Sequence, residues 1–234
     1  MELPQSEYQL GKMLLVDKPL EWTSFDVVNK LRYALKQKLG VKKIKVGHAG
    51  TLDPLATGLL ILMTGKFTKT IDSILGLSKT YTGTIQLGST RPSYDMETEI
   101  DLTFPTEQIN DALVAKVIKE EFLGDHMQYP PMFSAIKIDG KRLYKSAREG
   151  KEVERPQRKV HITRFEVQPL NGMELTFEIE CSKGTYIRSI ANDLGAALAS
   201  GGHLSSLRRT MIGEYHIKDG FTIEEHLEQI ATHN

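Results

Sequence analysis

The sequence predicts an α+β fold with a mixed, largely antiparallel central sheet flanked by helices. Residues 160–167 and 174–181 alternate between apolar and polar side chains, as half-buried strands do. Asn171-Gly172 lies between them and is typical of a tight hairpin turn, which joins antiparallel neighbours. Segments with apolar residues at helical spacing interrupt the strands, but without the regular alternation that builds a parallel sheet.

In the first half of the chain, turn and capping residues mark the ends of the expected elements. A strand over 12–17 ends at Lys18-Pro19, because proline cannot continue a sheet ladder. Thr23 or Ser24 can cap a helix that extends to about residue 39. We then expect a basic turn or strand over 41–46, a loop over 47–58, a buried strand over 59–63, a short helix over 67–75 and a strand over 80–87.

In the second half, an acidic and irregular segment over 89–103 precedes a helix that begins at Thr106 and ends near residue 122. Pro130-Pro131 forces an extended entry into a strand over 133–138. After it we expect one or two helical turns over 142–148, the two strands of the hairpin, a helix over 186–198, a strand near 211–217 and a helix near 223–230.

Composition restricts the class of protein. The 234 residues are 40% hydrophobic and 26% charged, as in ordinary globular proteins, and suffice for one large domain or two small ones. Cys181 is the single cysteine, which excludes an internal disulfide framework and a Cys/His metal cluster and favours a reducing cytoplasm. The longest apolar run, 59–63, is far shorter than the ~20 residues of a membrane span, and the first residues do not read as a signal peptide.

Charge is balanced in total but not along the chain. There are 30 basic and 30 acidic residues, yet 1–80 carries 12 basic and 7 acidic residues, and 81–130 carries 3 and 9. The segment 137–164, which we call the basic segment, has 10 basic and 4 acidic residues. Concentrated positive charge attracts polyanions, although such runs also coat ordinary solvated surfaces.

The loop over 47–58 displays a single carboxylate, Asp53. Three glycines permit a ligand to approach the backbone closely, and Pro54 keeps Asp53 out of the helical region. An acid held in this way suits nucleophilic or general-base chemistry. Considered alone, Asp-Pro is also a common pair in turns, so a purely structural role stays open.

The residues GHAGTLDPLATGLL, at 47–60, resemble the signature of the TruB family of pseudouridine synthases over fourteen consecutive positions. Similar blocks follow the family order at 17–24, 79–88, 130–144, 181–195 and 202–210, so the resemblance spans about 12–215. Glu21 stands where the family usually has glycine, so the turn after Pro19 is expected to differ. Arg91 and Ser93 stand where threonines are usual, although Asp95 remains, and that loop is expected to contact RNA differently.

The resemblance implies the pseudouridine synthase catalytic fold and an isomerisation of uridine at position 55 in the TΨC stem-loop of tRNA. The base leaves C1′, rotates and reattaches through C5, and no cofactor or metal is needed. Asp53 would be the essential carboxylate, which either attacks C1′ or takes a proton from C2′. The flipped base needs a pocket, because a stacked base is out of reach.

The resemblance also assigns the other site residues. Arg188 would pair with the catalytic carboxylate, and Tyr81 would stack on the flipped base and is a candidate to remove its C5 proton. The expected substrate-binding residues are His48, Tyr186, Leu207 and Lys18, and the candidates for RNA contact in the basic segment are Lys137, Lys141, Arg142 and Lys145. Taken singly, most of these positions would more often be core or surface residues.

We expect one catalytic domain over 1–234, with a core of about 12–215 and no separate C-terminal RNA-binding domain of the PUA type. Neither a guide RNA, an obligate protein partner nor a membrane is expected. Two other hypotheses are a non-enzymatic RNA-binding or RNA-folding protein and a hydrolase that uses Asp53 with a histidine. Joint presence of Asp53, Tyr81 and Arg188 argues against the first, and the lack of a serine elbow or metal cluster argues against the second.

Overall fold

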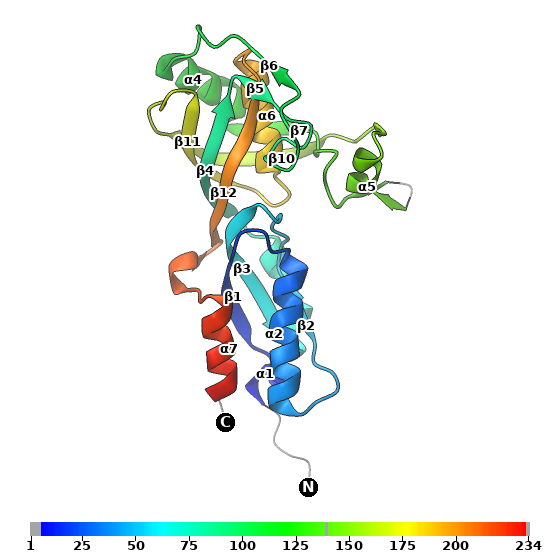
Figure 1. The fold of residues 1–234 in the computed structure, drawn as a ribbon. Coiled ribbons are helices and arrows are strands. Elements are labelled where there is room, and N and C mark those ends of the chain that lie inside the picture. Colours follow the sequence, from blue (N-terminus) through cyan, green and yellow to red (C-terminus); the bar gives the residue numbers. More distant parts are fainter. Residues whose placement is uncertain (1–5, 139, 233–234) are drawn as a thin grey trace. The chain divides into compact units, whose positions relative to one another are not determined.

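The computed structural model describes residues 6–138 and 140–232, and the chain divides into two compact units (Figure 1). The first unit contains the residues up to Tyr81 and those from Arg208 onward, and the second contains Thr82–Leu207. Strands β4 (Lys79–Leu87) and β12 (Gly202–Ile212) contribute residues to both. The expected single catalytic domain therefore stays a prediction, and the units are described separately.

The sheet of the first unit has the order β1-β3-β12. Strand β1 (Met13–Lys18) is antiparallel to β3 (Ala56–Thr64), β2 (Val46–His48) also pairs with β3, and β13 (Tyr215–His216) pairs with β12. Helices α2 (Ser24–Leu39) and α7 (Ile223–Thr232) lie side by side against this unit's sheet (Figure 1). The remaining elements are α1 (Glu7–Leu10), η1 (Gly65–Thr70), α3 (Ile71–Leu75) and η3 (Ile217–Asp219).

Strand β3 is buried on both faces, which explains its continuous apolar run. Leu60 and Leu62 point to a core formed with α2 and α7, and Leu59 and Ile61 point to a second core that includes Ile212. Each fully buried leucine or isoleucine contributes about 1.5–3 kcal/mol of transfer free energy. The strand that follows the Asp53 loop is therefore fixed from both sides.

Helix α2 begins and ends where its sequence predicts. The side chain of Thr23 accepts a hydrogen bond from the backbone of Asp26, whose side chain bonds in return to the backbone of Thr23. Gly40 ends the helix in the left-handed conformation. The predicted N-terminal cap and the predicted end near residue 39 are confirmed.

In the second unit the strand order is β12-β4-β11-β10-β7. Strands β10 (Arg158–Val167) and β11 (Glu174–Cys181) form the expected antiparallel pair, and β7 (Gly124–Gln128) lies on the other side of β10. The helices are α4 (Asp111–Val117), which continues as the π-helical turn η2 (Ile118–Phe122), α5 (Leu143–Arg148) and α6 (Ile187–Ala197). Two small sheets pair β5 (Ser89–Thr90) with β6 (Leu102–Thr103), and β8 (Lys137–Ile138) with β9 (Lys141–Arg142).

The predicted α+β class with a largely antiparallel sheet is confirmed, but several boundaries were wrong. Helix α4 begins at Asp111, after its cap Asn110, and not at Thr106. Within 133–138 only Lys137 and Ile138 form a strand. Strand β7 and most of β12 were not expected. Strand β7 is polar, and β12 carries two arginines with buried or hydrogen-bonded side chains, so neither strand alternates between apolar and polar residues.

No helix in the described part of the chain is long and apolar enough to cross a membrane. Among the same residues, no group of three or more His, Cys, Asp or Glu side chains could hold a metal ion.

Candidate active site

Asp53 lies in the first unit, in the loop that joins β2 to β3. The loop is shorter than the sequence suggested, because β2 ends at His48 and β3 begins at Ala56. The amide of Ala56 donates to the carbonyl of Asp53 at 3.1 Å, so Asp53 begins the turn that leads into β3. Its side chain is half-buried.

Ser24 fixes the residue that precedes Asp53. It is the first residue of α2 and is 2% exposed. Its hydroxyl accepts from the amide of Leu52 at 2.8 Å and donates to the carbonyl of the same residue at 3.1 Å. The capped start of α2 therefore holds the backbone next to the carboxylate.

Lys18 fixes the residue that follows Asp53. It is fully buried, and its ammonium group donates to the carbonyls of Pro19 (2.8 Å), Trp22 (2.6 Å) and Pro54 (3.4 Å). Burial lowers the pKa of Lys18 to about 8, while the negative charge of Asp53 acts in the opposite direction. These backbone contacts describe a positioning group for the Asp53-Pro54 turn, and the substrate contact expected for Lys18 stays a prediction.

Arg209 fixes the start of the loop. It is 1% exposed, and its guanidinium donates to the carbonyls of Gly50 at 3.0 Å, Thr51 at 3.5 Å and Leu59 at 2.8 Å. A Cβ on Gly58, which has φ of 98°, would lie 2.3 Å from the carbonyl oxygen of Arg209. Glycine there lets β3 and β12 approach closely enough for these bonds to form. Arg209 lies in one of the blocks that resemble the family, but its neighbours along the chain give no sign of this role.

His48 ends β2 and is half-buried. Burial lowers its pKa, and the positive charge of Arg209 adds to the effect. Both effects favour the neutral form of the His48 imidazole.

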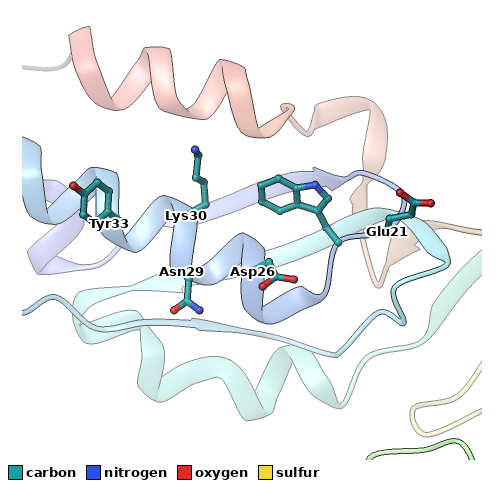
Figure 2. A pocket seen from close by; sticks show the side chains of 6 residues that line it. Glu21, Asp26, Asn29, Lys30 and Tyr33 are labelled. Atoms are coloured by element: carbon teal, nitrogen blue, oxygen red, sulfur yellow. The ribbon is translucent and has the colours of Figure 1, made fainter.

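Glu21 occupies the turn after Pro19 with φ of 66°, a left-handed conformation that glycine adopts easily. Glycine, the usual residue of the family at this position, could adopt the same backbone conformation. The amide of Glu21 donates to the carbonyl of Pro54 at 2.8 Å. A pocket of about 500 Å³ lies beside it, lined by Glu21, Asp26, Asn29, Lys30, Tyr33 and Trp22 (Figure 2). None of the predicted site residues lines this pocket.

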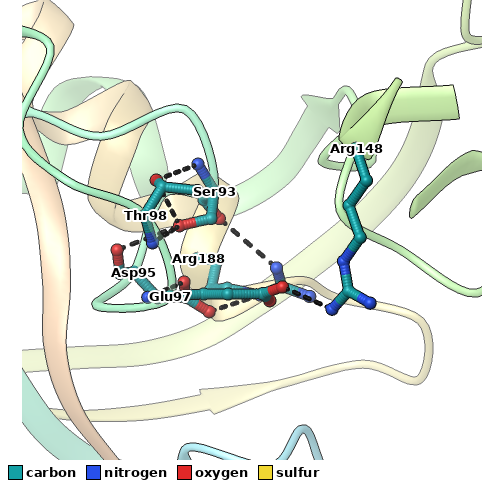
Figure 3. Close-up of polar contacts among 6 residues, drawn as sticks. All are labelled: Ser93, Asp95, Glu97, Thr98, Arg148 and Arg188. Atoms are coloured by element: carbon teal, nitrogen blue, oxygen red, sulfur yellow. Dashed lines mark hydrogen bonds and ion pairs between the residues drawn. The ribbon is translucent and has the colours of Figure 1, made fainter. Parts of the chain in front are cut away.

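Arg188 lies in the second unit, in the first turn of α6, and is 4% exposed. Its guanidinium donates to the carbonyl of Ser93 at 3.3 Å, and its Nε lies 3.5 Å from a carboxylate oxygen of Asp95 (Figure 3). Asp95 also accepts from the amide of Glu97 at 3.0 Å, and the hydroxyls of Ser93 and Thr98 are bonded at 2.9 Å. The loop between β5 and β6 thus holds the buried arginine.

Arg91 and Ser93, the two residues that differ from the family pattern, form hydrogen bonds that hold this loop. Arg91 donates to the carbonyl of Thr98 and to Nε2 of His203, the latter at 3.2 Å. His203 is 2% exposed, and its Nδ1 is 3.1 Å from the carbonyl oxygen of Ser89. Both departures therefore stabilise the loop that contacts Arg188.

Tyr186 precedes α6 and is held by Gln128, the last residue of β7. Gln128 is fully buried, accepts from the amide of Tyr186 at 2.8 Å and donates to its carbonyl at 3.0 Å. The guanidinium of Arg158 lies over the Tyr186 ring, 5.1 Å from its centroid. Gln128 gave no signal in the sequence because β7 itself was not expected.

The predicted site residues are divided between the two units. Asp53, Lys18 and His48 meet around the loop of the first unit, and Tyr81, 9% exposed, is the last β4 residue of that unit. Arg188, Tyr186 and Leu207 belong to the second. The expected pairing of Asp53 with Arg188 joins residues of different units and stays a prediction.

Many cations of the basic segment already have carboxylate partners. Lys141 and Lys151 pair with Glu149, Arg148 pairs with Glu97, and Lys159 pairs with Asp125. Three of the four RNA-contact candidates, Lys137, Arg142 and Lys145, are exposed and form no ion pair within the described residues.

Comparison with known proteins gives the family. Residues 36–187 match the "TruB family pseudouridylate synthase (N terminal domain)", and residues 188–234 match the "tRNA pseudouridylate synthase B C-terminal domain". The chain is 56% identical over 218 residues to "tRNA pseudouridine synthase B" of Flavobacterium johnsoniae, which covers 93% of this chain and 95% of that protein. The protein of the same name from Phocaeicola vulgatus is 51% identical over 217 residues, with 93% and 92% covered.

A solved structure shares the fold. The chain matches one in the "Crystal Structure of a Cbf5-Nop10-Gar1 Complex" with a TM-score of 0.69 and 28% identity, over 95% of this chain and 55% of that one. It thus spans about half the length of that solved protein. With both family domains matched and relatives similar along nearly their whole length, the chain belongs to the TruB family of pseudouridine synthases.

Proposed function

We propose that the chain isomerises uridine 55 in the TΨC stem-loop of tRNA to pseudouridine, with Asp53 as the essential carboxylate. Family membership supports the reaction, and the names of the two bacterial relatives support the substrate. The observation that carries the proposal is the Asp53 loop, whose backbone is held by buried side chains of Ser24, Lys18 and Arg209. A backbone held in this way would keep the Asp53 carboxylate in place for attack on a bound nucleotide.

The reaction needs no added group. The bond between N1 and C1′ breaks, the uracil rotates, and a bond forms between C5 and C1′. The C5 proton leaves and N1 gains a proton, so the composition and oxidation state are unchanged. Asp53 can serve by attack on C1′ or by removal of the C2′ proton, and both routes require an ionised carboxylate.

The other residues take the roles that the family resemblance gives them. Arg188 would pair with Asp53 and keep it ionised, since a nearby guanidinium favours the charged carboxylate. Tyr81 would stack on the flipped base and is the candidate for removal of the C5 proton. Tyr186 and Leu207 would line the uracil pocket, and neutral His48 would occupy the space that the flipped base leaves.

We propose that the protein acts in the cytoplasm on tRNA alone, without guide RNA, protein partner, metal or cofactor. The Flavobacterium relative, whose name gives no partner, is matched over 95% of its length. The Cbf5 chain, described in a complex with Nop10 and Gar1, is matched over 55% of its length. Lys18, buried against backbone carbonyls, would position the loop, and its expected contact with the substrate stays a prediction.

The test is carbodiimide mapping of an unmodified tRNA transcript treated with the purified protein. We expect pseudouridine at position 55 and none in a transcript with cytidine there. Dialysis against a chelator should leave the rate on pre-folded tRNA unchanged. Modification at another position would contradict the proposed site, and tight binding without any pseudouridine would favour the non-enzymatic alternative. Activity restored only by one divalent ion, with the RNA fold intact, would contradict the metal-free reaction.

A further inference from the structure

Four lysines of the first unit surround a surface pocket of about 380 Å³ that the proposed catalytic role does not use. Lys43 and Lys45 come from the segment before β2, and Lys66 and Lys69 come from η1. The other lining residues that the structure describes are uncharged, so no carboxylate among them lines the pocket. We call this set the lysine pocket.

The lysine pocket differs from the basic segment in the ion pairing of its cations. All four lysines are exposed, and none forms an ion pair with a described residue. Glu7, on the neighbouring α1, is taken up by an ion pair with Lys12 at 2.5 Å. Four ammonium groups without a partner among the described carboxylates create a positive potential that attracts anions.

Backbone contacts gather these lysines from two segments. The amide of Gly65 donates to the carbonyl of Lys45 at 2.9 Å, directly beyond the paired residues Val46 and Thr64. Ile44 and Val46 pack against the apolar core, which fixes the segment and leaves Lys43 and Lys45 at the surface. In η1, Lys66 and Lys69 are three residues apart and share one side of a 3-10 turn.

The chemistry of the lining selects the kind of ligand. A lysine ammonium is a compact, hydrated charge that binds phosphate without demanding a fixed geometry. None of the described residues that line the pocket is aromatic, so they offer no surface on which a base could stack. The ligand that fits is the sugar-phosphate backbone of a nucleic acid.

The lysine pocket and Asp53 lie beside opposite ends of β3. Gly65, which bonds to Lys45 at the pocket, directly follows the last residue of β3, and Asp53 lies in the loop before its first residue, Ala56. The nine residues of β3 span roughly 30 Å. A double helix of about nine base pairs has this length at about 3.4 Å per step. An RNA that presents a nucleotide to Asp53 can therefore place its backbone over these lysines if a stem of that length adjoins the nucleotide.

We infer that the lysine pocket binds backbone phosphates of the RNA whose uridine is presented to Asp53. This inference depends on the proposed function, because it assigns the pocket to the same substrate. The pocket then supplies a sequence-independent contact on the first unit, additional to any made by the basic segment.

The experiment compares two variants with the same loss of charge. In one, Lys43, Lys45, Lys66 and Lys69 are replaced by glutamine, and in the control the exposed Lys30, Lys116, Lys119 and Lys218 are replaced instead. Binding of tRNA is measured over a range of salt concentrations, after circular dichroism has shown that both variants are folded. Each lost phosphate contact lowers the log–log salt slope by about 0.7 to 0.9.

For the pocket variant, we expect the log–log salt slope of tRNA binding to fall by about 2 to 3 and the affinity to fall roughly tenfold or more. Both changes should be much smaller for the control. Arginine at the four positions should restore the parent slope, and turnover at saturating tRNA should change less than about twofold, because these contacts bind the ground and transition states alike. Equal slopes for the pocket variant and the control would overturn the inference and leave the pocket to an acidic protein or to solvent. Failure of the parent to form pseudouridine would instead contradict the proposed function, since the slopes report binding alone.

Discussion

The Asp53 loop and the basic segment 137–164 use polar side chains in opposite ways. Around Asp53, buried Lys18 and Arg209 direct their charges to backbone carbonyls of the loop. In the basic segment, cations such as Lys141 and Arg148 pair with carboxylates at the exposed surface.

The difference has an energetic consequence. A buried hydrogen bond from a charged donor contributes about 1.5–3 kcal/mol, whereas an exposed ion pair contributes about 0.2–1 kcal/mol. The loop is therefore fixed before substrate arrives, while the surface cations can exchange a carboxylate for an RNA phosphate at little cost. Chemistry would need the first property, and binding of varied RNA backbone would need the second.

The largest expected effect tests the first half of this contrast. Asp53→Asn keeps the volume of the side chain but removes the charge, so it can act neither as nucleophile nor as base. We expect turnover to fall by about 10³-fold or more while tRNA binding and folding are retained. Single-turnover formation of pseudouridine, with filter binding in parallel, measures both. Appreciable turnover by the purified variant would remove Asp53 from the chemistry.

The second prediction uses the buried charge of Lys18. Because the pKa of Lys18 is lowered to about 8 in the folded protein, the unfolded chain binds more protons between pH 8 and about 10.5. The free energy of unfolding of the parent minus that of Lys18→Met should therefore increase by roughly 2–3 kcal/mol between pH 7 and pH 10. Denaturant unfolding at several pH values measures the difference.

Lys30→Met is the matched control, because Lys30 is exposed on α2. It should show no such rise relative to the parent. A flat difference for Lys18→Met as well would mean that the ammonium group is not held in a buried environment, and the contrast between the two regions would weaken.

The third prediction concerns Gln128, which holds both polar backbone groups of Tyr186. Gln128→Met preserves the size of the side chain but leaves the amide of Tyr186 without this acceptor. We expect a loss of about 1–3 kcal/mol in the free energy of unfolding and a fall in kcat/KM of up to about 100-fold. Gln37→Met, at an exposed position of α2, should change neither. A stability loss with unchanged kcat/KM would separate Gln128 from the substrate pocket.

Local sequence signals gave the framework of this fold. The caps of α2, the β10–β11 hairpin and the loop that displays Asp53 were each readable from neighbouring residues, because turns and caps depend on local backbone chemistry. The roles of the site residues came from the family resemblance, since a lone Asp-Pro pair does not distinguish a catalyst from a turn.

The contacts that hold the site could not be read in this way. Ser24 and Leu52 are 28 residues apart, and Arg209 and Gly50 are 159 apart. No periodic pattern relates such positions, and a buried arginine in a strand resembles a surface residue when only its neighbours are considered. Strand β7 was not expected for a similar reason, because the polar residues after the helix that ends near residue 122 show no alternation.

The smallest expected effect tests the second half of the contrast, in the basic segment. Lys141 is paired with Glu149 at 2.7 Å, whereas Lys137, Arg142 and Lys145 are exposed and not ion-paired within the described residues. Neutralising these three together should lower the salt slope of tRNA binding by about 2, at about 0.7–0.9 per lost contact.

Lys141→Gln alone is the informative comparison, because Glu149 would have to release Lys141 before a phosphate could bind it. We expect a change in slope below that of Arg142→Gln, with turnover at saturating tRNA unchanged in both variants. If the two single variants lower the slope equally, the carboxylate partner does not compete with RNA. If neither lowers it, and the triple variant is folded and binds like the parent, the segment is a solvated surface and the contact with RNA lies elsewhere on the protein.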